Sequence, residues 1–105
     1  MKVALFGATG FVGAYILDSL IGEEYSSSIL IRESSKDKLP FLENTNIVFG
    51  DIEDLDAIEE TIKGSDAVIY NIGIIREFPK ERITFDRLHF EGLKNCVDIA
   101  ERLKV

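Results

Sequence analysis

The sequence begins with Met1-Lys2-Val3-Ala4-Leu5-Phe6-Gly7-Ala8-Thr9-Gly10-Phe11-Val12-Gly13, and this stretch decides the fold. Its apolar first half predicts a buried strand that Gly7 ends, and a helical pattern begins at about Gly10. Glycines recur at every third position across this junction of strand and helix. The amino end of a helix presents free N–H groups and a partial positive charge to an anion. We therefore expect this junction to hold a nucleotide diphosphate.

Each glycine of the junction has its own expected task. Gly7 permits a tight turn, Gly10 lets the backbone approach the pyrophosphate because it lacks a Cβ, and Gly13 lets the helix pack close to the strand. Between a first strand and a first helix, this spacing is a specific signal for such a site. The alternative is that these are ordinary turn and cap glycines of another α/β protein.

Length and composition place the chain in the globular class. It has 105 residues, close to the usual size of one domain, and its hydrophobic fraction of 46% excludes intrinsic disorder. No apolar run approaches the ~20 residues that span a bilayer, and we expect no leader, because Lys2 is followed at once by strand residues. The single cysteine, Cys96, has no internal disulfide partner, which agrees with a reducing compartment. We therefore expect a cytoplasmic protein without a membrane span.

The charge balance excludes nucleic acid as a partner. The net charge is −7, from 12 basic and 19 acidic residues, and no basic stripe interleaved with aromatic residues appears. Much of the acidic excess lies between Asp51 and Glu60, where it is typical of a solvated helix start.

Short apolar strands alternate with helices along the rest of the chain. After the first strand, strands are expected at 28–31, 47–49 and 67–72. Helices are expected from about 10 to 22, from 55 to the C′ glycine Gly64, and from the N-cap Thr84 to about 103. Pro40 leaves room for at most a short helix between 33 and 46. This order predicts an α/β fold, a doubly wound parallel sheet with strand order 3-2-1-4 and helices on both faces.

The spacing of apolar residues predicts which face of each helix is buried. In the first helix the expected buried face consists of Val12, Tyr15, Ile16, Ser19 and Leu20. In the last helix it consists of Phe85, Leu88, Gly92, Cys96, Ile99 and Leu103. Cys96 is therefore expected to be a core residue.

A charged residue follows the second strand, where an adenosine ribose is usually recognised. Arg32 lies 19 positions after Gly13, and an arginine there binds the 2′-phosphate of NADP, whereas an acidic residue binds the ribose diol of NAD. Guanidinium donors match phosphate oxygens in pairs, which favours NADP and leaves NAD as the alternative. Glu33 acts the other way, because its carboxylate would bind ribose hydroxyls or repel a phosphate. A simpler alternative is a surface arginine paired with Glu33.

The run Gly-Ala-Thr-Gly-Phe-Val-Gly at 7–13 resembles the extended and atypical short-chain dehydrogenases/reductases, including epimerase- and dehydratase-like members, which are Rossmann-fold NAD(P)-binding proteins. The resemblance covers essentially the whole chain. The segments 73–78 and 84–92 are similar to the atypical branch that includes a nucleotide-binding accessory subunit of respiratory complex I. In this family the sheet continues for several more strands. We therefore expect 1–105 to be an N-terminal NAD(P)-binding domain cut before a fifth strand, and its unpaired fourth strand predicts self-association or marginal stability.

The resemblance also implies which residues contact the cofactor. Asp51 and Ile52 would meet the adenine ring, although Asp51 is equally well interpreted as a helix-start aspartate. The pyrophosphate is expected over the amides of 10–12, the adenosine near Arg32 and Asp51, and the nicotinamide towards Gly73. His89 stands where extended members commonly carry Asn. The complete expected set is Gly7, Thr9, Gly10, Phe11, Val12, Gly13, Arg32, Asp51, Ile52, Asn71 and Gly73.

A catalytic pair is missing from the chain. Reductases of the resembling family use Tyr-x-x-x-Lys, in which the lysine lowers the pKa of the tyrosine so that the phenol can transfer a proton. The residues four positions after the three tyrosines are Ser19, Ile29 and Ile74. No metal-ligand spacing appears either. We therefore expect no hydride transfer from this chain alone. Three roles stay open for the protein: it is an oxidoreductase, epimerase or dehydratase with its catalytic residues elsewhere, it binds nucleotide for a structural or redox-sensing purpose without catalysis, or it is an interaction module that does not bind nucleotide.

Overall fold

The computed structural model describes residues 1–38, 44–74 and 76–105, so Pro40 and Ile75, which belong to segments interpreted above, lie outside the described residues. The elements follow in the order β1 (Lys2–Phe6), α1 (Phe11–Gly22), β2 (Ser26–Ile31), η1 (Glu33–Lys38), β3 (Thr45–Phe49), α2 (Leu55–Ile62), β4 (Ala67–Tyr70), η2 (Pro79–Glu81), η3 (Asp86–Glu91) and α3 (Gly92–Arg102). The predicted alternation of strands and helices is confirmed, with the short helix η1 after β2.

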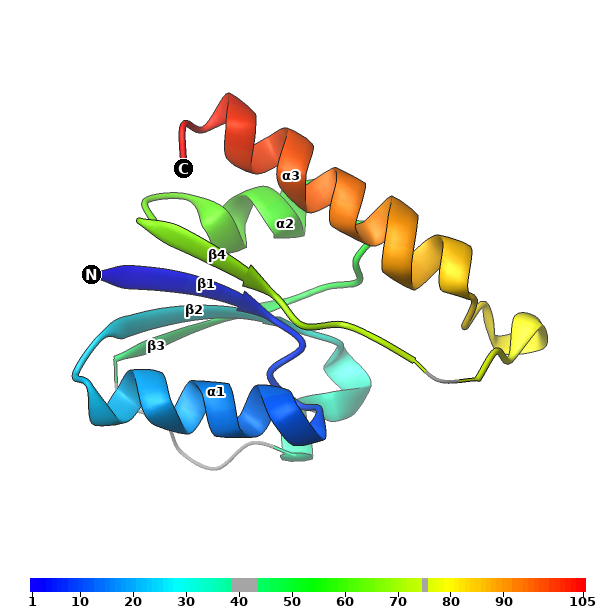
Figure 1. Ribbon diagram of the computed structural model, residues 1–105, viewed down its shortest axis with the longest axis horizontal. Helices are drawn as coiled ribbons and strands as arrows, with labels where there is room; N and C mark the ends of the chain where they lie inside the picture. Colours follow the sequence, from blue (N-terminus) through cyan, green and yellow to red (C-terminus); the bar gives the residue numbers. More distant parts are fainter. Residues whose placement is uncertain (39–43, 75) are drawn as a thin grey trace.

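The strands form one parallel sheet in the order β3-β2-β1-β4, as predicted. Leu5 in β1 lies opposite Ile29 in β2 and Ile69 in β4. Helix α1 covers one face of the sheet, and α2 and α3 cover the other (Figure 1). β2 and β3 begin two residues earlier than predicted, and β4 ends two residues earlier. Within the described ranges β4 pairs only with β1, and association through its other edge stays a prediction.

The central strand β1 is buried on both faces. Ala4 and Phe6 pack with α2 and α3, whereas Val3 and Leu5 pack with α1, and none of them is more than 3% exposed. Burial on both faces explains why the strand is apolar without alternation. Each large side chain buried in this way contributes ~1.5–3 kcal/mol, so packing on both faces of β1 stabilises the centre of the sheet.

The rotation of α1 differs from the predicted one. Val12, Tyr15 and Ser19 were assigned to the buried face, but all three are exposed. The buried residues are Gly13, Leu17 and Leu20. Because α1 is apolar at most positions, its periodicity does not fix its rotation. The rotation is set instead by the close approach of its first turn to the end of β1.

The predicted last helix consists of two parts with different backbone geometry. η3 is π-helical, since the amide of Gly92 donates to the carbonyl of Arg87 five residues earlier. Thr84 caps this segment as predicted, because its hydroxyl accepts from the amide of Arg87 at 3.1 Å. Phe85, assigned to the buried face, is 43% exposed, which corrects that prediction. Cys96 is buried as expected, and burial raises the pKa of its thiol to about 12.

Within the described residues, no helix is long and apolar enough to cross a membrane.

Candidate functional site

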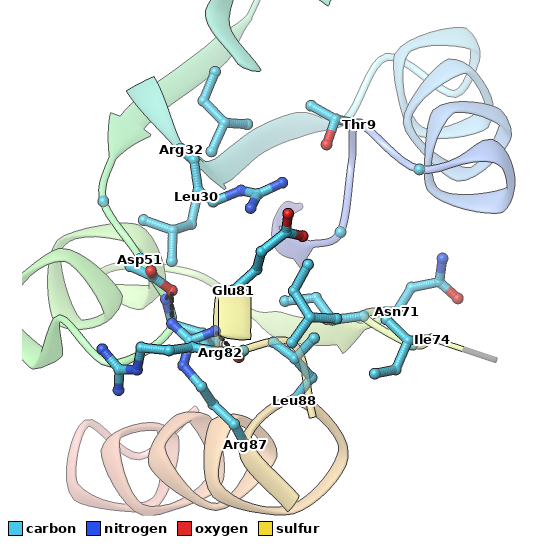
Figure 2. A pocket seen from close by; sticks show the side chains of 18 residues that line it. Thr9, Leu30, Arg32, Asp51, Asn71, Ile74, Glu81, Arg82, Arg87 and Leu88 are labelled. Carbon is cyan, nitrogen blue, oxygen red and sulfur yellow. Dashed lines mark hydrogen bonds and ion pairs between the residues drawn. The ribbon is translucent and has the colours of Figure 1, made fainter. Parts of the chain in front are cut away.

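A cleft of about 370 Å³ lies at the carboxyl ends of the strands (Figure 2). Its walls come from the turn between β1 and α1, the end of β2, the turn between β3 and α2, and the segment from β4 to η3. The volume falls in the range of ~300–1,000 Å³ usual for small-molecule sites. In open α/β sheets, ligands bind outside the carboxyl ends of the strands where the strand order reverses, which here lies between β1 and β4.

The glycine turn has the backbone geometry predicted for it. Gly7 has a φ of +100°, and a Cβ there would lie 2.5 Å from the carbonyl oxygen of Asn71. A Cβ at Gly13 would lie 1.8 Å from the carbonyl oxygen of Gly7, so only glycine allows α1 to approach β1 so closely. The predicted turn and packing tasks of these two glycines are therefore confirmed.

The amino end of α1 is open towards the cleft. Gly10 is its N-cap residue and has no side chain to cap the helix, so the first N–H groups of α1 are not satisfied by a side chain at this position. A Cβ at Gly10 would lie 3.5 Å from the carbonyl oxygen of Gly7, which is an ordinary contact. The fold itself therefore does not require glycine here, whereas close approach of an anion to the backbone does.

The cleft brings together most of the expected cofactor-binding residues. Eight of them line it: Gly7, Thr9, Gly10, Arg32, Asp51, Ile52, Asn71 and Gly73. Phe11, Val12 and Gly13 do not. Phe11 is 81% exposed, and its ring packs edge-on against that of Tyr15 outside the cleft.

Arg32 projects into the cleft (Figure 2). Glu33 forms an ion pair with Lys36 at 3.5 Å rather than with Arg32, so the simpler alternative of an Arg32–Glu33 pair is not what the structure contains. Within the described part of the chain, the Arg32 guanidinium has no ion-pair partner. It is therefore available to an anionic ligand.

Asp51 is not the residue that caps α2. The cap is Asp54, whose carboxylate accepts from the amide of Ala57 at 3.1 Å. Asp51 uses one oxygen, Oδ1, to accept from the amide of Ile52 at 2.6 Å and from the Nη2 of Arg87 at 2.7 Å. The helix-start interpretation of Asp51 was therefore wrong, and its carboxylate lines the cleft.

One wall of the cleft, formed by residues between Ile74 and Leu88, was not predicted from the sequence. Phe78 and Ile83 form an antiparallel bridge, with the amide of Phe78 donating to the carbonyl of Ile83 at 2.7 Å. Residues 78–83 thus form a short hairpin. Only its turn had a sequence signal, the Pro79 that starts η2. The missed lining residues of this wall are Ile74, Glu81, Arg82, Ile83, Arg87 and Leu88.

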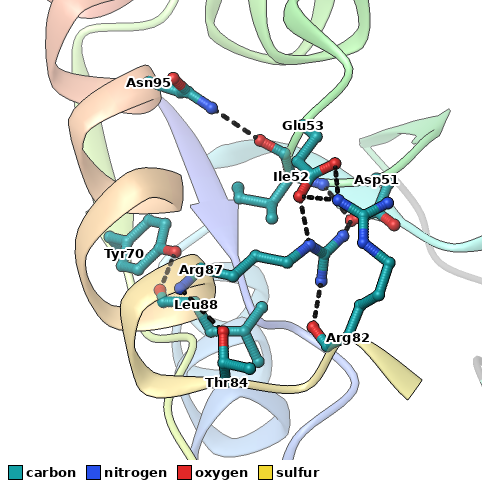
Figure 3. A network of polar contacts seen from close by, with 9 residues as sticks. All are labelled: Asp51, Ile52, Glu53, Tyr70, Arg82, Thr84, Arg87, Leu88 and Asn95. Carbon is teal, nitrogen blue, oxygen red and sulfur yellow. Dashed lines mark hydrogen bonds and ion pairs between the residues drawn. The ribbon is translucent and has the colours of Figure 1, made fainter. Parts of the chain in front are cut away.

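A network of charges joins this wall to the turn after β3 (Figure 3). Arg87 donates to Asp51, to Glu53 and to the carbonyl of Arg82, and Arg82 donates to both carboxylate oxygens of Glu53 at 2.6 Å. Hydrogen bonds from Arg87 and Arg82 hold the pKa of Glu53 below its usual value. Burial acts to lower the pKa of Arg87, but its contacts with Glu53 and Asp51 outweigh burial and raise it.

His89 holds the segment after β4. Its Nε2 accepts from the amide of Ile74 at 2.8 Å, which requires the proton of the neutral imidazole to be on Nδ1. The ring also packs against Phe85, with 5.4 Å between ring centroids. His89 therefore has a structural contact beside Gly73, at the end of the cleft expected to hold the nicotinamide.

The fold and the cleft together define a Rossmann-type dinucleotide-binding domain. Residues 7–105 match the family described as NAD(P)H-binding, and the chain belongs to this family. Its fold is shared with solved proteins of the short-chain dehydrogenase/reductase superfamily, such as the NAD-bound member from Agrobacterium tumefaciens, which matches with a TM-score of 0.78 and 22% identity over 100% of this chain and 30% of that one.

Two curated relatives are reductases or dehydrogenases. Phenylcoumaran benzylic ether reductase PT1 of Pinus taeda is 30% identical over 84 residues, which are 71% of this chain and 27% of the relative. The decarboxylating sterol-4-alpha-carboxylate 3-dehydrogenase of Dictyostelium discoideum is 30% identical over 96 residues, 85% of this chain and 29% of the relative. The chain thus spans less than a third of the length of these relatives.

A solved structure with the same fold is that of the Bordetella bronchiseptica enzyme WbmH in complex with NAD+. It matches with a TM-score of 0.80 and 21% identity, over 99% of this chain and 36% of that one. At this identity the likeness concerns the fold.

Proposed function

We propose that this NAD(P)-binding domain takes NADP, as the nucleotide-binding part of a short-chain dehydrogenase- or epimerase-like protein. The single observation that carries the proposal is the Arg32 guanidinium, which lines the cleft while Glu33 is paired with Lys36. A guanidinium that has no ion-pair partner among the described residues suits the 2′-phosphate at this position, because its planar donors pair with phosphate oxygens.

In the proposed complex the dinucleotide runs along the carboxyl ends of the strands. The pyrophosphate lies over the amides of 10–12, at the open amino end of α1. The adenosine lies between Arg32 and the Asp51–Ile52 turn, and the nicotinamide extends past Asn71 to Gly73. The glycine geometry supports this placement: of Gly7, Gly10 and Gly13, only Gly10 has room for a Cβ, so its lack of a side chain is explained by a ligand close to the backbone rather than by the packing of the fold.

Glu81 is the argument for NAD as the alternative cofactor. Its carboxylate enters the cleft from the wall opposite Arg32 (Figure 2). A carboxylate there repels a 2′-phosphate and accepts from ribose hydroxyls. Arg32 and Glu81 therefore act in opposite directions on the preference between NADP and NAD, and the proposal for NADP holds that the Arg32 guanidinium dominates.

For this segment the proposed role is binding rather than proton transfer. Tyr70 is the tyrosine nearest the cleft residues Asn71 and Gly73, but its hydroxyl donates to the carbonyl of Leu88 at 2.6 Å. Burial raises its pKa to about 12, opposite to the direction that a proton-transferring tyrosine needs. Any catalysis by the protein would therefore use groups other than Tyr70, and a non-catalytic nucleotide-binding role remains the second proposal.

Calorimetric titration with NADPH and NADH tests the cofactor. We expect tighter binding of NADPH, and we expect Arg32→Ala to remove that advantage while leaving the affinity for NADH within about twofold. Lys94→Ala is the matched control, since Lys94 pairs with Asp98 on α3 outside the cleft and its loss removes one positive charge as well. Equal loss of both affinities in Arg32→Ala, or tighter binding of NADH by the unaltered protein, would contradict the proposal.

A further inference from the structure

Arg87 is the most constrained charged side chain of the cleft wall. It is 13% exposed, although it lines the cleft, and all three of its nitrogens have acceptors. Nε donates to Glu53, Nη2 donates to Asp51 at 2.7 Å, and Nη1 donates to the carbonyl of Arg82 at 3.3 Å. A phosphate would have to displace two carboxylates to bind this guanidinium. Arg87 is therefore poorly placed as an anion ligand, in contrast to Arg32.

Arg87 acts on the orientation of Asp51. The carboxylate of Asp51 is half-exposed on a turn, and its Oδ1 is fixed from two sides, by the amide of Ile52 and by Arg87. The described part of the chain places no donor on Oδ2. An ionised carboxylate only accepts hydrogen bonds, so the ligand group that this oxygen selects is a donor. On a purine, the exocyclic 6-amino group is such a donor, whereas a 6-oxo group at the same position is an acceptor that the carboxylate repels, and the donor of that edge is moved to N1.

The backbone explains why the contact comes from Arg87. The π-helical geometry of η3, with the bond from Gly92 to the carbonyl of Arg87, widens the helix at this residue. Such π segments often occur at functional sites. Arg82 strengthens this connection in two ways. Its guanidinium donates to the carboxylate of Glu53, and its carbonyl, on a residue with αL backbone geometry, accepts from Arg87. The turn that carries Asp51 is thus fixed to the opposite wall.

We propose that Arg87 is a positioning residue that orients Asp51, so that the cleft distinguishes a 6-aminopurine from a 6-oxopurine at the adenosine end of its ligand. The inference rests on the proposed binding of a dinucleotide with its adenosine between Arg32 and Asp51. In this proposal Arg87 does not contact the base itself and acts on base selectivity through the carboxylate of Asp51.

The test compares a dinucleotide with its base-altered analogue. NADPH or NADH, whichever the protein binds more tightly, and the corresponding nicotinamide hypoxanthine dinucleotide are titrated calorimetrically into the protein and into Arg87→Leu. The unaltered protein should prefer the adenine form about tenfold, the size expected for one hydrogen bond to a charged group. Arg87→Leu should lower this ratio towards one, chiefly by weakening the adenine form. Arg102→Leu is the matched control, since Arg102 pairs with Glu59 at 3.1 Å outside the cleft, and should keep the ratio.

The ratio separates positioning from a purely structural role. If Arg87 only held the wall together, its loss would weaken both dinucleotides equally and leave the ratio unchanged, which would overturn the inference while the proposed function stood. An unaltered protein that binds neither dinucleotide would overturn the proposed function and the inference with it. Should Arg87→Leu fail to fold, Arg87→Gln, which keeps a donor but not the charge, carries the same comparison. An unchanged ratio in that variant also overturns the inference.

Discussion

Three glycine-to-alanine substitutions at α1 have predicted effects of different sign. The introduced Cβ would lie 1.8 Å from the carbonyl oxygen of Gly7 in Gly13→Ala, 3.5 Å from the same atom in Gly10→Ala, and in open space in Gly22→Ala. The same methyl group is thus added at the start, in the first turn and at the end of one helix. Only its surroundings differ, so the comparison isolates packing from helix propensity.

The geometry gives the size of each effect. Because a Cβ essentially never lies within 3.0 Å of such an atom, α1 must move by about 1.2 Å in Gly13→Ala, and the obstructing atom is backbone. Overpacking of this kind costs ~3 kcal/mol, which a gain of ~1 kcal/mol in helix propensity reduces to ~2 kcal/mol. Gly22→Ala gains up to ~1 kcal/mol from propensity. Gly10→Ala has a small cost, below ~1 kcal/mol, which comes from the poor capping of a helix by alanine and not from a clash.

Thermal unfolding and dinucleotide titration measure both consequences. The midpoint of Gly13→Ala should fall by about 10 °C, and that of Gly22→Ala should stay level or rise. Gly10→Ala should remain folded and lose dinucleotide affinity at least tenfold, because its methyl group occupies the space proposed for the pyrophosphate. A Gly13→Ala protein as stable as Gly22→Ala would refute the packing argument. Unchanged affinity in Gly10→Ala would refute the proposed position of the pyrophosphate.

Two further predictions concern the cleft wall. The lowered pKa of Glu53 means that its contribution to folding is complete above its usual value of 4.5 and is lost as the pH falls through its folded-state value. Unfolding midpoints from pH 7 to pH 3 should therefore show the protein and Glu53→Gln converging below about 4.5, and parallel curves would contradict this. Tyr70→Phe removes the hydrogen bond to the carbonyl of Leu88 and should destabilise the protein by ~1 kcal/mol in urea unfolding. No change would mean that the bond contributes nothing to stability.

Local features and the strand order of this fold were predictable from sequence, whereas the rotation of α1 and the long-range side-chain contacts were not. The tasks of Gly7 and Gly13 follow from a turn and a helix start that are adjacent in the chain. The strand order follows from short crossovers of fixed hand. The rotation of α1 did not follow, because apolar residues such as Val12 and Tyr15 surround the helix and one contact, at Gly13, decides which of them face the sheet.

The missed wall of the cleft depends on pairs far apart in sequence. Arg82 meets Glu53 across 29 residues and Arg87 meets Asp51 across 36. In the sequence Arg82 belongs to a run of mixed charge that is typical of a solvated segment, and Arg87 lies in the first turn of the predicted last helix, where nothing indicates a contact with Asp51. Only the tertiary structure shows that Arg87 is nearly buried and that Asp51, rather than capping α2, faces the cleft.

The central claim is that the dinucleotide binds in the cleft at the carboxyl ends of the strands, and mapping of backbone amide resonances during titration with NADPH tests it most directly. The account predicts the largest shifts at 10–12, Arg32, the Asp51–Ile52 turn and Gly73, with little change along the outer face of α3. Saturable shifts confined to residues outside the cleft, or none at millimolar NADPH and NADH, would contradict it.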